Sequence, residues 1–346
     1  MKKYRFGVLG LKMGGMWVEG VMRNPAAELV AVYDPNMEGG RAFMTQRKIT
    51  LPAPESVKQS EDEFFDADMD VVIVATPDHL HVPQSVRALR RGCHVICEKP
   101  MAPTVADCKK IIDAAKKYKR WFMTGQVGRY TPGFRAAKQL IVEGTIGEMV
   151  FIESEYYHNY AHVEGVGKWR SDPKIRREGF IGGGCHALDL LRWLGGNPLE
   201  VHCYMNHKYL PTWPTNDTGV AIFKMPNNVI GKVFVSIGVK AGYSMRTVIH
   251  GKEGSIICDN TSDTLTLFNA QYQKTGIPGM GRAWKVPVTV NNHNVAAEVD
   301  EFVKCLQAGK RPPTDEFEGA NTVAFGEAAL TSARTGRPVK VKNLRR

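Results

Sequence analysis

Short apolar runs alternate with helical patterns over the first third of the chain, and this alternation limits the possible folds most strongly. Five runs rich in β-branched residues predict strands, and they span residues 5–10, 28–34, 70–76, 93–97 and 121–124. Their side chains are apolar almost without a break, as in strands buried on both faces of a sheet. The alternation predicts an α/β fold with a doubly wound parallel sheet over residues 1–125.

After residue 125 the pattern changes to longer strand-like runs with few helices between them. The predicted strands span residues 148–157, 199–205, 217–225, 229–239, 255–258 and 337–342, and the predicted helices 134–142, 187–194, 296–306 and 320–333. This predicts that residues 126–346 form an α+β domain, with helices on one face of a mostly antiparallel open sheet. Two domains also suit a length of 346 residues, at roughly 150 residues per domain.

The composition excludes several classes of protein. Hydrophobic residues make up 43% of the chain, which excludes a disordered chain. The seven cysteines are an odd number and include no CxxC pair, so we expect reduced thiols rather than a disulfide framework or a zinc ribbon.

No run approaches the roughly 20 apolar residues that cross a bilayer. The basic N-terminus lacks the apolar core of a signal peptide, and we therefore expect a cytoplasmic location.

The net charge of +11 raises the question of a nucleic-acid partner. Lysines between residues 109 and 119 share a helical pattern whose other face is apolar, and this is typical of a solvated helix face. We expect neither a nucleic-acid nor a membrane partner. A basic surface that attracts an anionic small molecule is the simpler interpretation.

A glycine-containing loop follows the first predicted strand and has the sequence Gly10-Leu11-Lys12-Met13-Gly14-Gly15. A dinucleotide-binding loop has the pattern G-x-G-x-x-G between a strand and a helix. Gly10 and Gly15 fit its first and third glycines, whereas Lys12 occupies the position of the second. A plain strand–helix turn is the alternative.

Asp34 ends the second predicted strand and supports cofactor binding. An acidic residue at this point of a Rossmann domain can bind the ribose 2′-hydroxyl, and its charge repels a 2′-phosphate. Asp34 therefore favours NAD over NADP as the cofactor. The alternative role is a turn residue before Pro35.

Two polar segments, Ala75 to His81 and Glu98-Lys99-Pro100, follow the third and fourth predicted strands. Ligands bind at the carboxyl ends of the strands in such sheets. The predicted cofactor contacts are Gly10, Lys12, Met13, Gly14, Gly15, Asp34, Thr76, Pro77, His81, Glu98 and Lys99.

Together with the glycine loop, these segments resemble the glucose-fructose oxidoreductase, inositol dehydrogenase and rhizopine catabolism (Gfo/Idh/MocA) family. The resemblance continues through Val127-Gly128-Arg129-Tyr130, Lys168-Trp169-Arg170, Gly184-Cys185-His186-Ala187-Leu188-Asp189, and the ending Glu327-Ala328-Ala329 to Gly336-Arg337-Pro338. It implies an NAD(P)-dependent enzyme that acts on sugars or polyols and assembles as a homodimer or homotetramer.

The resemblance also implies two catalytic residues. The family's Glu-Lys-Pro lysine falls on Lys99, and its second-domain histidine falls on His186. A histidine can accept the hydroxyl proton during alcohol oxidation, and a lysine ammonium can stabilise the developing alkoxide. Without the resemblance, Lys99 would be a surface lysine and His186 a buried structural histidine.

The chain departs from the family pattern at Gly182. Typical sugar dehydrogenases of the family carry an aspartate four residues before the histidine, and Gly182 occupies that position here. Asp172 and Glu164 are candidates to replace this acid. Asp189, three residues after the histidine, could bind substrate or brace the helix.

The segment Glu155 to His162 is rich in tyrosine and histidine, which can stack on sugar rings or move protons. A structural loop is the alternative. His158 and His162 have a spacing found in zinc sites, but the HExxH pattern is absent and no metal is predicted. Cys185 is interpreted as a packed thiol. The predicted substrate contacts are Tyr157, His158, His162, Trp169, Arg170 and Asp189.

The main functional hypothesis is therefore an NAD-dependent oxidoreductase that transfers hydride to or from a hydroxyl carbon of a sugar, sugar derivative or glycoside. One alternative is a glycosidase, in which transient oxidation of a sugar hydroxyl acidifies the neighbouring C–H bond and allows elimination of the aglycone. A second alternative is a non-catalytic NAD-binding sensor, which Lys12 and Gly182 motivate.

Overall fold

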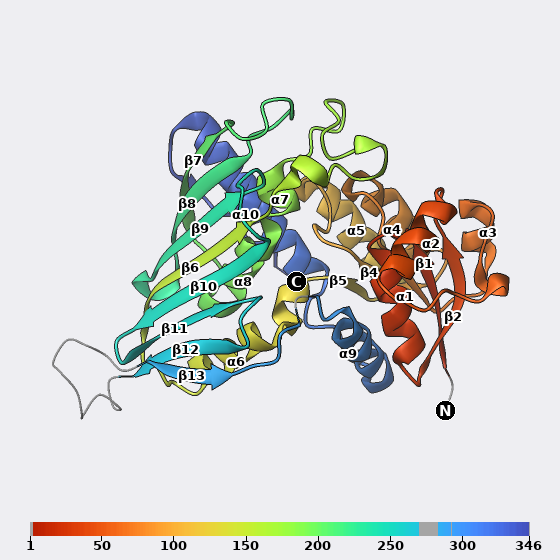
Figure 1. Cartoon of the computed structure of the whole chain (residues 1–346), viewed down its shortest axis with the longest axis horizontal. Helices are drawn as coiled ribbons and strands as arrows, with labels where there is room; N and C mark the ends of the chain where they lie inside the picture. The colour runs from red at the N-terminus through yellow and green to blue at the C-terminus, as the bar shows by residue number, and fades with distance from the viewer. Residues whose placement is uncertain (1–2, 270–282, 292, 346) are drawn as a thin grey trace. The chain divides into compact units, whose positions relative to one another are not determined.

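The structure, a computed structural model, describes residues 3–269, 283–291 and 293–345. The chain forms two compact units (Figure 1). Unit 1 comprises residues 1–126, 294–321 and 345–346, and unit 2 comprises residues 127–293 and 322–344. The predicted boundary after residue 125 lies one residue from the observed one. However, residues 294–321 return to unit 1, whereas the sequence analysis assigned them to the second domain.

Unit 1 contains a five-stranded sheet in which every neighbouring pair is parallel, as predicted. The strands are β1 (Tyr4–Leu9), β2 (Ala27–Tyr33), β3 (Val71–Val74), β4 (His94–Cys97) and β5 (Phe122–Thr124). Their order is β2-β1-β3-β4-β5. The strand order reverses between β1 and β3, and ligands bind at the carboxyl side of such a switch point.

The helices of unit 1 surround this sheet (Figure 1). They are α1 (Gly14–Arg23), α2 (Met37–Gln46), α3 (Glu61–Asp66), α4 (His81–Arg90), α5 (Val105–Tyr118) and α9 (Val295–Ala308). On α5, Cys108, Ile111 and Ala115 are buried, whereas Lys109 and Lys116 are exposed. The lysine-rich stretch is thus a solvated helix face, as predicted.

The return of α9 to unit 1 depends on tertiary packing. A Cβ atom on Gly20 of α1 would lie 3.2 Å from the Cα atom of Ala296, so the two helices approach closely. The Asn24 side chain also donates a hydrogen bond to Asp300 at 2.6 Å. Contacts across so many residues leave no local pattern in the sequence, which explains why the domain assignment missed them.

Unit 2 contains a nine-stranded sheet in the order β13-β12-β11-β10-β6-β9-β8-β7-β14. Only the β6–β9 pair is parallel among its described pairs, so the predicted, mostly antiparallel sheet is confirmed. The strands are β6 (Met149–Tyr157), β7 (Glu200–Asn206), β8 (Thr218–Lys224), β9 (Ile230–Ser236), β10 (Ser244–Gly251), β11 (Gly254–Asp259), β12 (Thr264–Asn269), β13 (Trp284–Pro287) and β14 (Val339–Lys340). The sequence analysis did not predict β10, β12 or β13.

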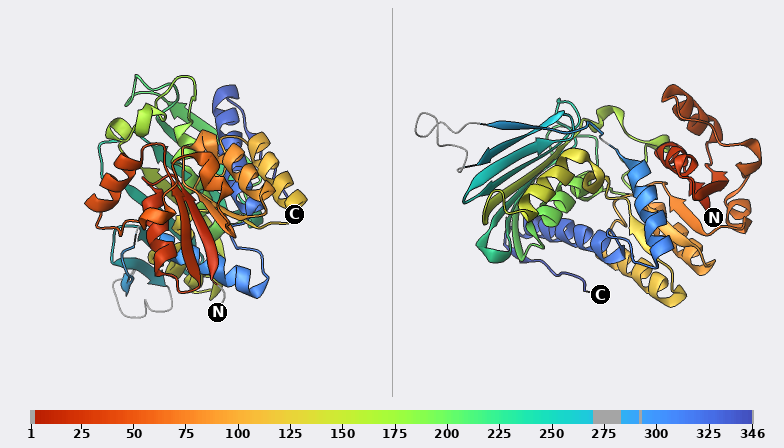
Figure 2. Two further views of the ribbon diagram at one scale, coloured as in Figure 1. Left: turned by 90° about the vertical axis from the view of Figure 1, so that its right-hand side faces the viewer. Right: turned by 90° about the horizontal axis from the view of Figure 1, so that it is seen from below.

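Helices cover one face of this sheet (Figure 2). They are α6 (Pro132–Val142), α7 (Gly179–Gly182), α8 (Cys185–Gly195) and α10 (Glu316–Thr335), whose first residues belong to unit 1. Short 3-10 helices occur at η1 (Pro54–Ser56), η2 (Asp78–Leu80), η3 (Val127–Tyr130), η4 (Tyr160–His162), η5 (Val166–Lys168) and η6 (Pro226–Asn228). None of the helices in the described ranges is long and apolar enough to cross a membrane.

The side chains of β6 alternate between the two faces of the sheet. Ile152, Ser154 and Tyr156 are buried on the face that the helices cover. Glu153 and Glu155 lie on the opposite face, because successive side chains of a strand point in opposite directions. This alternation decides which residues of the tyrosine-rich segment can meet α8.

Candidate active site

Gly10 and Gly15 are glycines because their surroundings leave no room for a side chain. Gly10 has φ +84°, and a Cβ atom there would lie 2.6 Å from the carbonyl oxygen of Ala75. A Cβ atom on Gly15 would lie 2.7 Å from Cγ of Met44 on α2. Lys12, by contrast, is exposed at the loop tip. The loop therefore accepts a lysine at the second position of the pattern.

The beginning of α1 suits an anionic ligand. No side chain caps this end of the helix, and its first turn contains no acidic residue. Backbone N–H groups at such an end, together with the helix dipole, favour a phosphate group. Gly14, with no side chain between the helix and Val8, keeps the backbone close to the sheet. The residues present thus fit the pyrophosphate of a dinucleotide, with Met13 and Gly14 at the helix start.

Asp34 holds the glycine loop in place. Its Oδ2 atom accepts a hydrogen bond from the backbone N–H of Leu11 at 2.7 Å, and Oδ1 accepts one from Asn36 at 2.7 Å. The carboxylate thus has the turn-forming role that the sequence analysis considered. A carboxylate has about four acceptor sites, so contact with a ribose hydroxyl stays a prediction.

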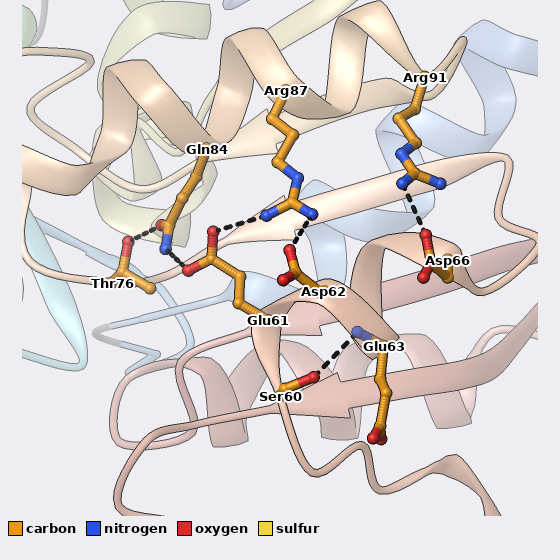
Figure 3. A network of polar contacts seen from close by, with 9 residues as sticks. All are labelled: Ser60, Glu61, Asp62, Glu63, Asp66, Thr76, Gln84, Arg87 and Arg91. Atoms are coloured by element: carbon orange, nitrogen blue, oxygen red, sulfur yellow. Dashed lines mark hydrogen bonds and ion pairs between the residues drawn. The ribbon is translucent and has the colours of Figure 1, made fainter.

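Polar contacts connect the loop after β3 to two helices (Figure 3). The Thr76 hydroxyl donates to Oε1 of Gln84 at 2.6 Å, and the amide of Gln84 donates to Glu61 of α3 at 3.0 Å. Arg87 contacts Glu61 at 3.4 Å and Asp62 at 2.5 Å. Thr76 and the following Pro77 are therefore held by α4, which in turn is held by α3.

His81 joins the loops after β3 and β4. Its ring is fully buried, with Nδ1 2.8 Å from the carbonyl oxygen of Pro100 and Nε2 2.9 Å from that of Thr76. Carbonyl oxygens only accept, so both ring nitrogens must donate and the ring is an imidazolium. Burial by itself lowers the pKa of His81, but Cys97, Asp78 and the Pro100 carbonyl outweigh it and raise the pKa to about 10. His81 was predicted to contact the cofactor; instead, both nitrogens bind the protein's own backbone.

Glu98 is also bound within unit 1. Its Oε1 atom accepts a hydrogen bond from the indole N–H of Trp17 at 2.8 Å, and Oε2 accepts one from the Lys99 N–H at 3.2 Å. The carboxylate predicted as a cofactor contact therefore holds α1 against the end of β4. The Lys99 side chain is partly buried, and its peptide bond to Pro100 is cis.

His186 of unit 2 lies in a cluster of tyrosine and histidine rings. The cluster consists of His186, Tyr156, His158, Tyr160, Tyr243 and His293. His186 is 2% exposed, and the ring of Tyr156 stacks on it with a centroid distance of 5.6 Å. The Tyr156 and Tyr160 hydroxyls are 2.9 Å apart, and Nδ1 of His158 is 3.5 Å from the former. We call this group the Tyr–His cluster.

Tyr243 and His293 complete the Tyr–His cluster. Their rings stack at 5.6 Å, Tyr243 meets His158 at 4.9 Å, and His293 meets the edge of His186 at 6.5 Å. Burial raises the pKa of Tyr156 well above its usual range, Tyr160 and Tyr243 raise it further, and Arg177 opposes them. Tyr156 therefore keeps its hydroxyl proton near neutral pH and can donate a hydrogen bond.

The tyrosine-rich segment contributes different residues from those predicted. Tyr157 lies on the other face of the sheet, where its ring is 6.4 Å from that of Phe234. Tyr156 faces His186 instead, and the alternation with Ile152 and Ser154 could have identified it. His158 belongs to the Tyr–His cluster, whereas His162 is exposed at the end of η4. No group of metal-ligating residues occurs in the described part of the chain.

The sequence analysis missed Tyr243, His293 and Arg177. Tyr243 immediately precedes β10, a strand that was not predicted. His293 is isolated in the sequence and reaches the Tyr–His cluster only through the fold. Arg177 precedes α7 and had no local motif to mark it.

Asp189 has a structural role, which corrects its prediction as a substrate contact. Its carboxylate accepts two hydrogen bonds of 2.7 Å from Arg129 and one of 3.0 Å from the Thr322 hydroxyl. Arg192 lies 3.6 Å away, and Asp189 is only 2% exposed. A buried, bidentate pair of this kind holds α8 to η3 and α10.

Both candidate acids for the family position make bonds within their own local segments. Asp172 accepts a hydrogen bond from the Lys174 N–H at 2.7 Å, which closes its own turn. Glu164 accepts one from the Ser171 hydroxyl at 2.9 Å and lies 3.4 Å from Lys168. Cys185 is buried, with its thiol 3.6 Å from the Gly182 carbonyl oxygen, as expected of a packed thiol.

Comparison with known proteins identifies the family. Residues 4–126 match the model of the oxidoreductase family with an NAD-binding Rossmann fold, and residues 134–257 match the GFO/IDH/MocA C-terminal domain. The chain belongs to the GFO/IDH/MocA oxidoreductase family. Unit 1 is thus the NAD-binding Rossmann domain, and a family of oxidoreductases supports an enzyme over a non-catalytic sensor.

Relatives within the GFO/IDH/MocA family align over nearly the whole chain. A 1,5-anhydro-D-fructose reductase of Ensifer adhaerens is 27% identical, with 98% of each chain covered. A scyllo-inositol 2-dehydrogenase (NAD(+)) of Bacillus subtilis is 26% identical over 97% of this chain and 96% of the relative. A levoglucosan dehydrogenase in complex with NADH has a TM-score of 0.84 at 21% identity, covering 99% of this chain and all of that one, and shows the shared fold.

The charged state of His81 predicts a pH-dependent stability. A pKa raised from 6.5 to about 10 means that the stabilisation is complete below pH 6.5 and is lost as the pH rises through 10. The unfolding free energy lost in His81→Gln should therefore be largest near pH 6 and shrink by on the order of 2–4 kcal/mol by pH 10. Urea unfolding of both proteins between pH 6 and pH 10 measures this loss of unfolding free energy, with the exposed His250→Gln as control. A loss that is the same at every pH would contradict a charged His81.

The position of Asp34 predicts a preference for NAD. Wild-type protein should bind NAD about tenfold or more tightly than NADP, because the carboxylate repels a 2′-phosphate. Asp34→Asn keeps an oxygen for the Leu11 N–H but removes the charge. It should tighten NADP binding while NAD affinity changes less, as measured by calorimetry. Equal affinities in the wild type would contradict the role given to Asp34.

Proposed function

We propose that the protein transfers hydride between NAD and a hydroxyl-bearing carbon of a sugar, sugar derivative or glycoside. NAD supplies the hydride acceptor or donor when bound. The observation that carries the proposal is the Tyr–His cluster around His186, in a chain whose other unit is an NAD-binding domain. The names of the full-length relatives, which refer to anhydrofructose and inositol, support a sugar or polyol substrate.

The chemistry requires a proton acceptor beside the reacting hydroxyl. Oxidation of a secondary alcohol removes a hydride from carbon and a proton from oxygen, and the imidazole of His186 would take the proton. Tyr156 stacks on this ring and would fix its plane. The ammonium group of Lys99 would stabilise the negative charge that develops on the substrate oxygen.

A glycosidase with transient oxidation is the second candidate function. It would need acid and base groups beyond those of a simple dehydrogenase, because elimination requires protonation of the leaving group and removal of a carbon-bound proton. His158 and His293 of the Tyr–His cluster could supply them, and this surplus of titratable groups is the observation that favours this function.

Substitution of His186 tests the proposed reaction. His186→Asn should lower kcat by about 10²- to 10⁴-fold, because general base catalysis contributes that much, while NAD affinity stays unchanged. Near-ultraviolet absorbance of NADH and mass spectrometry of the products would be followed together, over a panel of sugars, inositols and glycosides. The exposed His250→Asn is the matched control.

The products separate the two candidate functions. A product two hydrogens lighter than its substrate, with a matching rise in NADH, supports the dehydrogenase. Release of aglycone without net NADH would instead support the glycosidase. If no compound of the panel gave either an oxidised product or a released aglycone, the result would contradict an enzyme that acts on sugars.

We also propose that the protein is a homo-oligomer through the outer face of the sheet of unit 2. Tyr204, Ile222 and Ile230 are exposed there by 72%, 54% and 55%. The same face carries the pairs Lys232–Glu153 and Arg246–Glu155, at 2.9 Å and 3.5 Å. A face that carries charges of both signs can meet a second copy of itself under a two-fold rotation with opposite charges opposed, which favours a second copy as its partner.

Light scattering tests this association. The measured mass should be a multiple of the 38.4 kDa chain and should fall toward one chain in Ile222→Asp, because a buried charge opposes association. Lys12→Asp, at an exposed position of unit 1, is the control. A mass of one chain for the wild type at every concentration would contradict the proposal.

A further inference from the structure

A cavity of about 610 Å³ lies within unit 2, and its lining residues are different from those of the Tyr–His cluster. They come from α10, from the residue before α7, from the end of β7 and from the segment before β8. Sites for small molecules have volumes of roughly 300–1,000 Å³. The cavity is therefore large enough for a small molecule, and the proposed reaction does not use it.

The walls of the cavity belong to elements that are fixed to one another. A Cβ atom on Gly326 of α10 would lie 2.5 Å from Cγ1 of Ile181, so α10 packs closely on α7. Farther along α10, the Ser332 hydroxyl accepts a hydrogen bond of 3.0 Å from the backbone N–H of Cys203 on β7. Since α10 is held at two points, the residues that it turns toward the cavity line a preformed space.

One face of α10 lines the cavity. Glu327, Leu330, Thr331 and Arg334 have the spacing i, i+3, i+4 and i+7, which places them on one side of a helix. Seven residues rise by roughly 10 Å along a helix axis. This side of α10 therefore runs from a carboxylate to a guanidinium, with an apolar and a hydroxyl side chain between them.

Glu178 adds a second carboxylate at the acidic end of the cavity. It immediately precedes α7, which contacts α10 at Gly326, the residue before Glu327. Among the described residues, the Glu178 carboxylate has no hydrogen-bond or ion-pair partner. Burial raises the pKa of Glu178, and the charge of Arg176 opposes this rise. A cation in the cavity would stabilise the ionised carboxylate, which burial disfavours.

Arg334 supplies the opposite charge at the other end. Its side chain is exposed, and its guanidinium likewise has no hydrogen-bond or ion-pair partner in the described part of the chain. Between the charged ends, Leu330 and Met205 provide apolar surface, and Asn216 provides an amide. The cavity thus offers an acidic end, a mainly apolar middle and a basic mouth.

We propose that this cavity is a second ligand site, which binds a small zwitterion through its ammonium group at Glu178 and its carboxylate or phosphate group at Arg334. Charge-assisted hydrogen bonds of this kind are stronger than neutral ones, and a guanidinium matches the oxygens of both anionic groups. Amino acids and amino sugar phosphates share this chemistry. The site goes beyond the proposed hydride transfer and does not depend on it.

The test measures binding of a zwitterion and of its two halves to the full chain by calorimetry. The probes are 6-aminohexanoate, hexylamine and hexanoate, which have the same carbon chain but different charges. 6-Aminohexanoate should bind about 10- to 100-fold more tightly than either single-charge probe, the contribution of a hydrogen bond to a charged group.

A second series distinguishes the two sources of the zwitterion. It compares glucosamine 6-phosphate with glucosamine and with glucose 6-phosphate in the same measurement. A preference for 6-aminohexanoate within its series indicates an amino acid ligand, and a preference for glucosamine 6-phosphate within its series indicates an amino sugar phosphate.

Variants assign the preference to the two charged groups. In Glu178→Gln, the zwitterion should bind no more tightly than the anionic probe of its series, and in Arg334→Gln, no more tightly than the cationic one. Glu253→Gln and Arg337→Gln remove the same charges at exposed positions outside the cavity lining and are the matched controls. Because Arg334 is itself exposed, its substitution keeps the test valid even if Glu178→Gln lowers the melting temperature.

Two results would overturn the inference. One is that neither zwitterion binds more tightly than its single-charge probes, and the other is a preference that both Glu178→Gln and Arg334→Gln leave unchanged. The measurement involves no hydride transfer, so either result would leave the proposed function standing. Loss of sugar oxidation in His186→Asn with unchanged zwitterion binding would in turn show that the two sites are independent.

Discussion

The lack of side chains at Gly182, Gly183 and Gly184 is the constraint on which the candidate site depends. A Cβ atom at Gly184 would lie 2.2 Å from the carbonyl oxygen of Phe180, so α7 could not turn into α8 as it does. The same turn sets His186 on the second position of α8 and brings it against Tyr156. The turn at these three glycines therefore decides where the imidazole lies.

Three buried polar side chains are held by partners within their own unit. His81 donates to two backbone carbonyls, Glu98 accepts from Trp17, and Asp189 accepts from Arg129. Burying such groups without partners would be costly, and their bonds instead fix loops and helices around the sites. His81, Glu98 and Asp189, which motifs marked as ligand contacts, thus bind other parts of the protein. A sequence motif can therefore include residues that stabilise the structure around a site as well as residues that contact the ligand.

Local sequence patterns determined the strands of both sheets, apart from β10, β12 and β13, because alternation and apolar runs depend on neighbouring residues. They also determined the glycine loop, where close packing at Gly10 and Gly15 requires glycine, and most of the helix α8, although the predicted helix began at residue 187, one residue after His186. The tertiary structure decided the rest. Arg129 and Asp189 pair across 60 residues, α9 returns to α1, and Arg177 fills the space at Gly182. Such contacts join residues whose separation in the chain leaves no periodic signal, so only the packed fold could show them.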